Sequence, residues 1–153
     1  MLQPFQALPD ARMLEKKWAD EALKSFDAVV GRMAGFRNRD GQRKMAAQVA
    51  ETLSRAQLGK VDEDQPAARS AIAVIQAGTG VGKSLAYSIP AISMALARGT
   101  RVLISTATVA LQEQLVSKDL PALAEQLGTP FKFALAKGRG RFVCKLKLER
   151  MAS

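Results

Sequence analysis

A glycine-rich stretch that ends in Gly-Lys-Ser contains the residues of this sequence best suited to chemistry. It reads AGTGVGKS and comprises Ala77, Gly78, Thr79, Gly80, Val81, Gly82, Lys83 and Ser84. Glycines let successive backbone N–H groups approach phosphate oxygens without a clash from Cβ atoms. Lys83 offers a positive charge to the β- and γ-phosphates of a nucleotide, and the Ser84 hydroxyl is a ligand for Mg²⁺. The stretch therefore predicts a nucleotide-binding loop in which Lys83 and Ser84 are the catalytic residues.

This loop departs from the strict phosphate-binding pattern at one position, because Ala77 stands where that pattern has glycine. The alternative is a glycine-rich turn between a buried strand and a helix, with Lys83 merely solvated. The flanking sequence favours the nucleotide site, since residues 72–75 have strand character and an apolar helical pattern begins at Leu85. A phosphate-binding loop requires this order of strand, loop and helix, and the helix N-terminus adds its dipole.

The elements that must position the loop follow an alternating pattern. Strands are predicted at 72–75, 101–105 and 131–136, the second of them buried. Helical spacing covers 85–98 and 106–127, with Pro90 expected to kink the first of these helices and a break expected at residues 119–121. Strands that alternate with helices imply right-handed crossovers and a parallel sheet. The predicted fold class is therefore α/β.

Two further helical patterns precede the loop. The first runs from Asp10 to Met33 and places Trp18 and Phe26 on its apolar side, where we expect them to face a core rather than to stack on bases. The second has one apolar face, formed by Met45, Val49 and Leu53. Residues 59–70 are polar and contain a proline, so we interpret them as a loop.

Composition limits the range of functions. The 153 residues suit one domain, and 23 basic against 14 acidic residues give a net charge of +9, which favours a nucleic-acid partner although many basic domains bind none. The absence of histidine excludes histidine-based zinc sites and Ser–His or Cys–His catalysis. A single cysteine excludes a disulfide within the chain. No apolar run is long enough to span a bilayer and no signal-peptide core is found, so we expect a cytoplasmic protein with no membrane partner.

The order of motifs from Phe36 to Glu149 resembles the N-terminal part of superfamily 2 helicases, and most closely the DinG branch of the XPD-like group. The segment FRNRDGQ resembles the adenine-recognition segment of this family, which implies that Arg39 and Gln42 contact the base. A glutamine amide can both donate to and accept from the adenine edge. AGTGVGKS resembles helicase motif I, whose first position is normally alanine, so Ala77 fits the family.

A third segment, STATVALQEQL, resembles motif Ia of these helicases. The resemblance implies that Thr106, Thr108 and Gln114 contact single-stranded DNA at the carboxyl edge of the sheet. The alternative is that the threonines only cap the helix that follows, since Ser and Thr are common at helix starts.

The fourth feature, KDLPAL followed by KGRGRFVC, resembles the segment that leads into the first cysteine of the family's iron–sulfur cluster. Lys137, Arg139 and Arg141 would then guide DNA electrostatically. Cys144 would be the first ligand of a 4Fe–4S cluster, but only in a longer chain that supplies three more thiolates. The alternative is that Cys144 is a small buried hydrophobic residue.

Taken together, the resemblance implies a partial RecA-like three-layer P-loop domain with a parallel sheet, preceded by an N-terminal helix. Its parts are a helical lead-in (1–35), a partial motor domain 1 (36–136) and a basic segment that leads into a truncated iron–sulfur-type region (137–153). The chain ends within a basic, helix-forming run, from which we expect a truncation.

The function implied is an ATP-dependent DNA helicase that uses ATP and Mg²⁺ to translocate on single-stranded or forked DNA. Its partner would be the remainder of the helicase chain, with an acidic box and a second motor domain. Because neither is found here, we expect the chain alone to bind nucleotide and DNA with little hydrolysis. Two alternatives are a stand-alone basic nucleic-acid-binding module with a vestigial loop, and a P-loop enzyme acting on a small substrate.

Overall fold

The computed structural model describes residues 11–33, 39–57 and 68–152, and the regular elements within these ranges are helical. In chain order they are α1 (Ala11–Arg32), α2 (Asp40–Arg55), α3 (Lys83–Arg98), α4 (Val109–Gln114), a π-helical turn (Leu115–Asp119), α5 (Leu120–Gln126), a 3-10 turn (Arg139–Arg141) and α6 (Lys145–Ala152). No helix in the described ranges is both long enough and apolar enough to cross a membrane.

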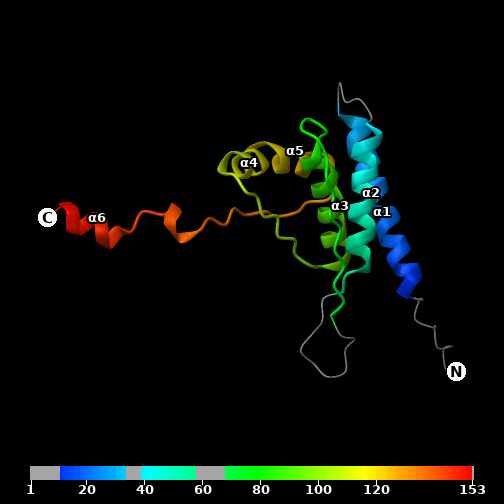
Figure 1. The fold of residues 1–153 in the computed structure, drawn as a ribbon, viewed down its shortest axis with the longest axis horizontal. Coiled ribbons are helices and arrows are strands. Elements are labelled where there is room, and N and C mark those ends of the chain that lie inside the picture. The colour runs from blue at the N-terminus through cyan, green and yellow to red at the C-terminus, as the bar shows by residue number, and fades with distance from the viewer. Residues whose placement is uncertain (1–10, 34–38, 58–67, 153) are drawn as a thin grey trace.

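Helices α1, α2 and α3 pack side by side and form the body of the molecule (Figure 1). Phe26 and Val29 of α1 meet Ile89 of α3 in the main core, and Leu123 closes that core from α5. Burying one such side chain contributes about 1.5–3 kcal/mol. The predicted N-terminal helix is confirmed, and so is the core position of Phe26, which is 1% exposed.

Helix α2 turns a face of small residues toward its neighbours. Ala46 and Ala50 are fully buried on it, whereas the predicted apolar residues are half-buried beside this face: Met45, Val49 and Leu53. Met45 and Leu53 of the predicted apolar face pack against the core clusters, and the fully buried positions lie one residue further along the helix. Short alanine side chains let α1 and α3 approach the axis of α2, and the longer side chains then cover the edges of the contact.

Arg98, in the last turn of α3, joins the three helices. Its side chain stacks 4.2 Å from the ring centroid of Trp18 on α1. The guanidinium also donates to three carbonyl oxygens at the end of α2, namely those of Leu53 (3.0 Å), Ser54 (2.7 Å) and Ala56 (2.8 Å). The carbonyl of Leu53 also accepts from the N–H of Ala56, and the guanidinium supplies a further donor to carbonyls at this helix C-terminus. Burial lowers the pKa of the Arg98 guanidinium, and the charge of Glu15 opposes this shift.

The predicted parallel sheet does not form within the described residues. The segments predicted as strands are extended but form no backbone hydrogen bonds with one another in the described ranges, where the isolated bridge joins Gln57 to Arg69 in antiparallel orientation. The prediction that 101–105 is buried is also wrong, because Leu103 is 89% exposed. An apolar, β-branched segment has the capacity to pair, but a strand forms only where a neighbouring backbone is present.

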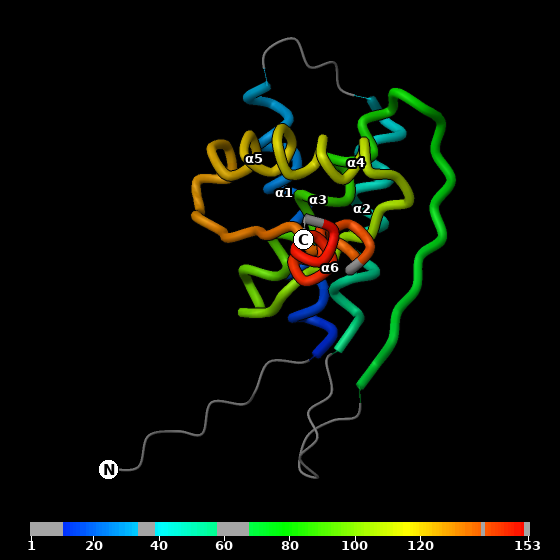
Figure 2. Tube along the Cα trace, turned by 90° about the vertical axis from the view of Figure 1, so that its left-hand side faces the viewer, coloured from blue at the N-terminus to red at the C-terminus, as the bar shows by residue number. Residues whose placement is uncertain are grey.

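The helical pattern predicted for 106–127 is present as one nearly continuous rod (Figure 2). The break expected near Pro121 takes the form of the π-helical turn, which ends at Asp119, after which α5 begins at Leu120. Pro90 lies within α3 and is buried. After residue 136 the chain leaves the helical body, and α6 lies at the end of a projecting arm (Figure 1).

Candidate nucleotide-binding site

The glycine-rich loop runs directly into α3, as the sequence predicts. Gly82 is the residue before the helix and has φ +82°, a left-handed conformation that favours glycine. A Cβ atom at Gly82 would lie 2.3 Å from Nε2 of Gln42, so the approach of α2 also requires glycine here. The first intrahelical bond joins the N–H of Ala86 to the carbonyl of Gly82, which leaves the earlier amides of α3 for a ligand.

Lys83 folds back over the loop. Its Nζ donates to the carbonyl oxygens of Ala77 (3.0 Å) and Gly78 (2.7 Å). The ammonium group is therefore held inside the loop, at the position where phosphate oxygens would need a counter-charge. An anion there would compete with two neutral carbonyls for the same three N–H donors, and charge-assisted hydrogen bonds are the stronger ones.

Arg39 and Gln42, the two residues assigned to the adenine base by resemblance, both contact the loop backbone. Nε2 of Gln42 donates to the carbonyl of Gly82 at 2.8 Å, and the guanidinium of Arg39 donates to the carbonyl of Gly80. Gln42 is 1% exposed, and its Oε1 is buried without a hydrogen-bond partner. A buried acceptor without a partner is costly, so this oxygen is suited to a donor supplied by a ligand.

The contact between Gln42 and Gly82 could not be read from the resemblance, but the sequence holds a signal for it. Gln42 precedes Ala46 and Ala50 at intervals of four, so it lies on the same helical face as two alanines that the structure buries. A polar residue on a buried face needs a partner, and a nearby carbonyl of the loop provides one.

Of the residues predicted to contact DNA, the two threonines make hydrogen bonds at the start of α4, and Gln114 makes a separate one. Oγ1 of Thr106 donates to the carbonyl of Thr108 (3.2 Å), and Oγ1 of Thr108 accepts from the N–H of Leu111 (3.3 Å). Thr108 thus caps α4, as the alternative interpretation holds. Nε2 of Gln114 donates to Asp119 Oδ2 at 3.2 Å.

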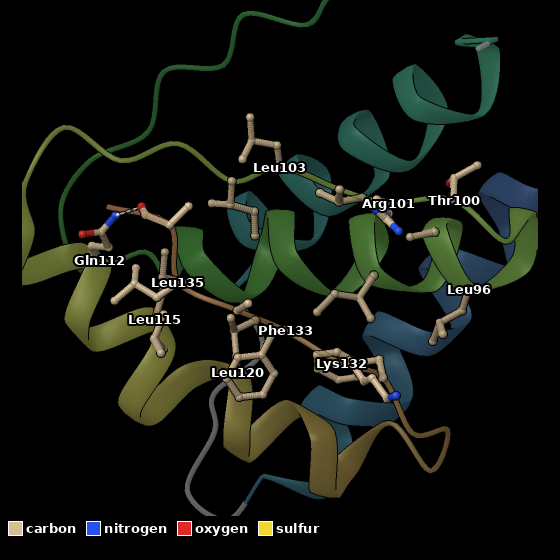
Figure 3. Close-up of a pocket in the computed structure, with 18 of the residues that line it drawn as sticks. Leu96, Thr100, Arg101, Leu103, Gln112, Leu115, Leu120, Lys132, Phe133 and Leu135 are labelled. Carbon is tan, nitrogen blue, oxygen red and sulfur yellow. Dashed lines mark hydrogen bonds between the residues drawn. The ribbon is translucent and has the colours of Figure 1, made fainter. Parts of the chain in front are cut away.

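Sequence reasoning missed Gln112, which contacts the start of the basic segment. Its Nε2 donates to the carbonyl of Ala136 at 3.4 Å, immediately before Lys137 and the projecting arm (Figure 3). Gln112 therefore links the start of the α4–α5 rod to the start of the basic segment. The hydrogen bond joins segments that are 24 residues apart, which spacing alone could not predict.

The basic segment is exposed along its described length. Lys137 and Arg141 are exposed, and the N–H of Arg141 donates to the carbonyl of Gly138 at 2.9 Å, which forms the 3-10 turn. Cys144 is an exposed free thiol, so its interpretation as a small buried hydrophobic residue is wrong. Within the described ranges, no three His, Cys, Asp or Glu side chains gather into a metal site.

Known proteins resemble this chain over most of its length. Residues 62–140 match the model of the DEAD/DEAH box helicase family. The ATP-dependent DNA helicase DinG of Photobacterium profundum is 39% identical over 137 residues, which cover 90% of this chain. The ATP-dependent helicase DinG of Mycobacterium tuberculosis is 43% identical over 124 residues (78% of this chain), and that of Escherichia coli K12 is 41% identical over 128 residues (84%).

These matches cover only 16 to 18% of the length of the relatives. The matched residues include the whole glycine-rich loop, the segment 105–115 and the start of the basic segment, and the family's members have a RecA-like α/β fold. The matched residues and the geometry of the loop together identify the chain as a member of the DEAD/DEAH box helicase family.

Proposed function

We propose that this chain is the ATP- and DNA-binding N-terminal part of an ATP-dependent DNA helicase. The observation that carries the proposal is the convergence of Arg39, Gln42 and Lys83 on one loop, although they lie up to 44 positions apart in the sequence. The names of the relatives support the same activity. Hydrolysis that drives translocation and unwinding would belong to the longer protein.

The residues of the loop fit ATP and Mg²⁺. ATP would supply the phosphoryl group, with its phosphates at the N-terminus of α3 and Lys83 released from the carbonyls of Ala77 and Gly78. The unpartnered Oε1 of Gln42 would accept from the amino group of adenine. Ser84 would provide one Mg²⁺ ligand, and Mg²⁺ commonly takes its others from phosphates and water.

The extended segments at 72–75, 101–105 and 131–136 would be strands of a RecA-like parallel sheet. In this arrangement Thr106 and Thr108 follow one strand, and Lys137 follows another. Parallel strands end at the same edge of a sheet, where α/β proteins bind ligands. Single-stranded or forked DNA would pass this edge, guided by Arg139 and Arg141, and Cys144 would be the first ligand of a 4Fe–4S cluster whose other thiolates lie elsewhere.

The nucleotide site is tested by Lys83→Ala. We expect ATP affinity to fall about 30-fold, since the variant removes a charge-assisted contact worth roughly 2 kcal/mol. Isothermal titration with ATP and Mg²⁺ measures the loss. Lys118→Ala is the matched control, because Lys118 lies on the π-helical turn outside the loop. Equal affinity in Lys83→Ala and in the unmodified chain would contradict the site.

The DNA surface is tested by replacing Lys137, Arg139 and Arg141 with alanine together. Each single-strand phosphate contact contributes about −0.7 to the slope of log K against log salt, so we expect the slope to shrink by about 2. Fluorescence anisotropy with an oligothymidine between low and moderate salt measures it. Replacing Lys16, Lys17 and Lys24 of α1 removes the same charge elsewhere and should leave the slope nearly unchanged. Equal slopes in the two triple variants would contradict the role of the arm.

A further inference from the structure

An ion pair joins the last third of α1 to the first turn of α2. Nε of Arg43 donates to Oδ1 of Asp27 at 2.8 Å, and Nη2 of Arg43 donates to Oδ2 of the same carboxylate at 2.8 Å. Two parallel hydrogen bonds between a guanidinium and a carboxylate fix the relative orientation of the two groups as well as their distance. Asp27 therefore constrains both the place and the direction of the Arg43 side chain.

The first turn of α2 carries the residues that we assign to adenine. Arg39 is the residue before the helix, and Gln42 directly precedes Arg43. The amide of Gln42 faces the nucleotide-binding loop, because its Nε2 donates to the carbonyl of Gly82 at 2.8 Å and its Oε1 is buried without a partner. Asp27 thus holds the residue that follows the glutamine expected to contact the base.

This first turn is not held by a capping side chain. Arg39, the residue at the cap position, makes no side-chain hydrogen bond to the helix. Its carbonyl accepts from the N–H groups of Gln42 (2.9 Å) and Arg43 (3.2 Å), and the N–H groups nearer the start of a helix have no partner within it. A helix start without a cap is less stable than a capped one. Contacts with the rest of the fold must therefore order this turn, and the ion pair with Asp27 is such a contact.

Packing keeps this part of α1 in place beside α2 (Figure 1). Phe26 and Val29, close to Asp27 in the helix, are each 1% exposed and share a core with Ala46, which lies one turn after Gln42 on α2. The ion pair itself lies at the surface, since its two side chains are 43% and 47% exposed. A pair this exposed adds little to the free energy of unfolding, so its main effect is on the orientation of the turn.

We propose that Asp27 is a positioning residue for adenine recognition, because its two hydrogen bonds to Arg43 fix the first turn of α2 and with it the direction of the Gln42 amide. The pair would raise the affinity for the base and leave the phosphate contacts unchanged, since Lys83 belongs to the loop and α3. The inference rests on the proposed nucleotide site and extends it to α1, which lies before the residues matched by the family model, 62–140.

Asp27→Ala tests the proposal through the ratio of two affinities, for ATP and for inorganic tripolyphosphate, each with Mg²⁺. Tripolyphosphate offers the loop and Lys83 a chain of three phosphates but no base. A variant that only reduces the folded fraction lowers both apparent affinities by the same factor, so the ratio reports on the base. We expect the ratio of ATP affinity to tripolyphosphate affinity to fall about 5-fold, which is the size of one hydrogen bond. Isothermal titration with the 153-residue chain measures both affinities.

Glu15→Ala is the matched control. Glu15 also pairs with an arginine of another segment, Arg69, at 3.0 Å, but it lies roughly 18 Å from Asp27 along the axis of α1. Its removal should leave the ratio within about twofold of the unmodified chain. The double variant Asp27→Arg, Arg43→Asp exchanges the two charges and should restore the ratio to the same range.

Two results would overturn the proposal. One is a ratio that Asp27→Ala leaves unaltered, and the other is an equal fall in Asp27→Ala and Glu15→Ala. An unmodified chain that binds neither ATP nor tripolyphosphate would contradict the proposed nucleotide site itself, and the inference with it. Binding of both ligands with an unaltered ratio would leave that site standing and remove only the role of Asp27.

Discussion

Gly82→Ala is expected to lower ATP affinity at least 100-fold and to destabilise the folded chain by about 3 kcal/mol. The left-handed backbone at Gly82, with φ +82°, costs roughly 1–2 kcal/mol for a residue with a Cβ atom. The new Cβ would lie 2.3 Å from Nε2 of Gln42. Gln42 must then move, and a buried amide that loses its hydrogen bond costs a further 1–3 kcal/mol or so. Either change moves the loop amides and Lys83 away from the phosphates.

The matched control is Gly78→Ala in the same loop. No atom lies within 4 Å of a Cβ at Gly78, so the nucleotide-free stability should change by less than about 0.5 kcal/mol. Urea unfolding without nucleotide gives the stability of both variants, and isothermal titration gives the affinity of Gly82→Ala. If Gly82→Ala and Gly78→Ala had the same free energy of unfolding, the close packing of Gln42 on Gly82 would not contribute to the stability of the folded chain.

Arg98→Ala is expected to cost about 4 kcal/mol of folding free energy, which corresponds to a fall in melting temperature of about 15 °C. The variant removes three hydrogen bonds from a charged donor to the end of α2, together with a cation–π contact to Trp18 that is worth roughly 1 kcal/mol. The three carbonyls are left without this partner near the protein interior, and Trp18 loses the group that covers its ring. Thermal unfolding followed by circular dichroism measures the loss.

Two variants separate the role of Arg98 from a general effect of removing an arginine. Arg32→Ala removes an exposed arginine that makes one hydrogen bond, to the carbonyl of Gln126 at 3.0 Å, and should cost less than about 1 kcal/mol. Arg98→Lys keeps the charge near Trp18 but cannot bond three carbonyls in one plane, so it should fall between the two. Equal melting temperatures for Arg98→Ala and Arg32→Ala would show that the carbonyl oxygens at the end of α2 find other hydrogen-bond donors when Arg98 is removed.

The sequence alone predicted those features of the fold that depend on residues close to one another in the chain. Periodicity alone predicted α1 and the core position of Phe26, and the glycine-rich motif correctly located the loop that ends at Lys83. These features depend on residues within a few turns of one another. The α4–α5 rod was predicted for the same reason, although the geometry of its break was not.

The features that failed depend on groups that are distant in the chain. The segment 101–105 has the composition of a buried strand, but burial requires a partner that its own residues do not specify, and Leu103 is exposed. Likewise the contacts of Gln42 with Gly82 and of Gln112 with Ala136 join residues 40 and 24 positions apart. A motif reports which residue types occur in which order, whereas these contacts depend on how whole helices are docked.

The π-helical turn controls the rotational phase of the rod that crosses α3. Leu115 at its start and Leu123 beyond it are both buried, and they are eight residues apart. At about 100° per residue, eight residues of uninterrupted α-helix overshoot two full turns by about 80°, whereas seven fall about 20° short. The turn absorbs one residue into a wider loop of backbone and brings the two leucines back into phase, so one inserted residue lets a single rod bury both side chains.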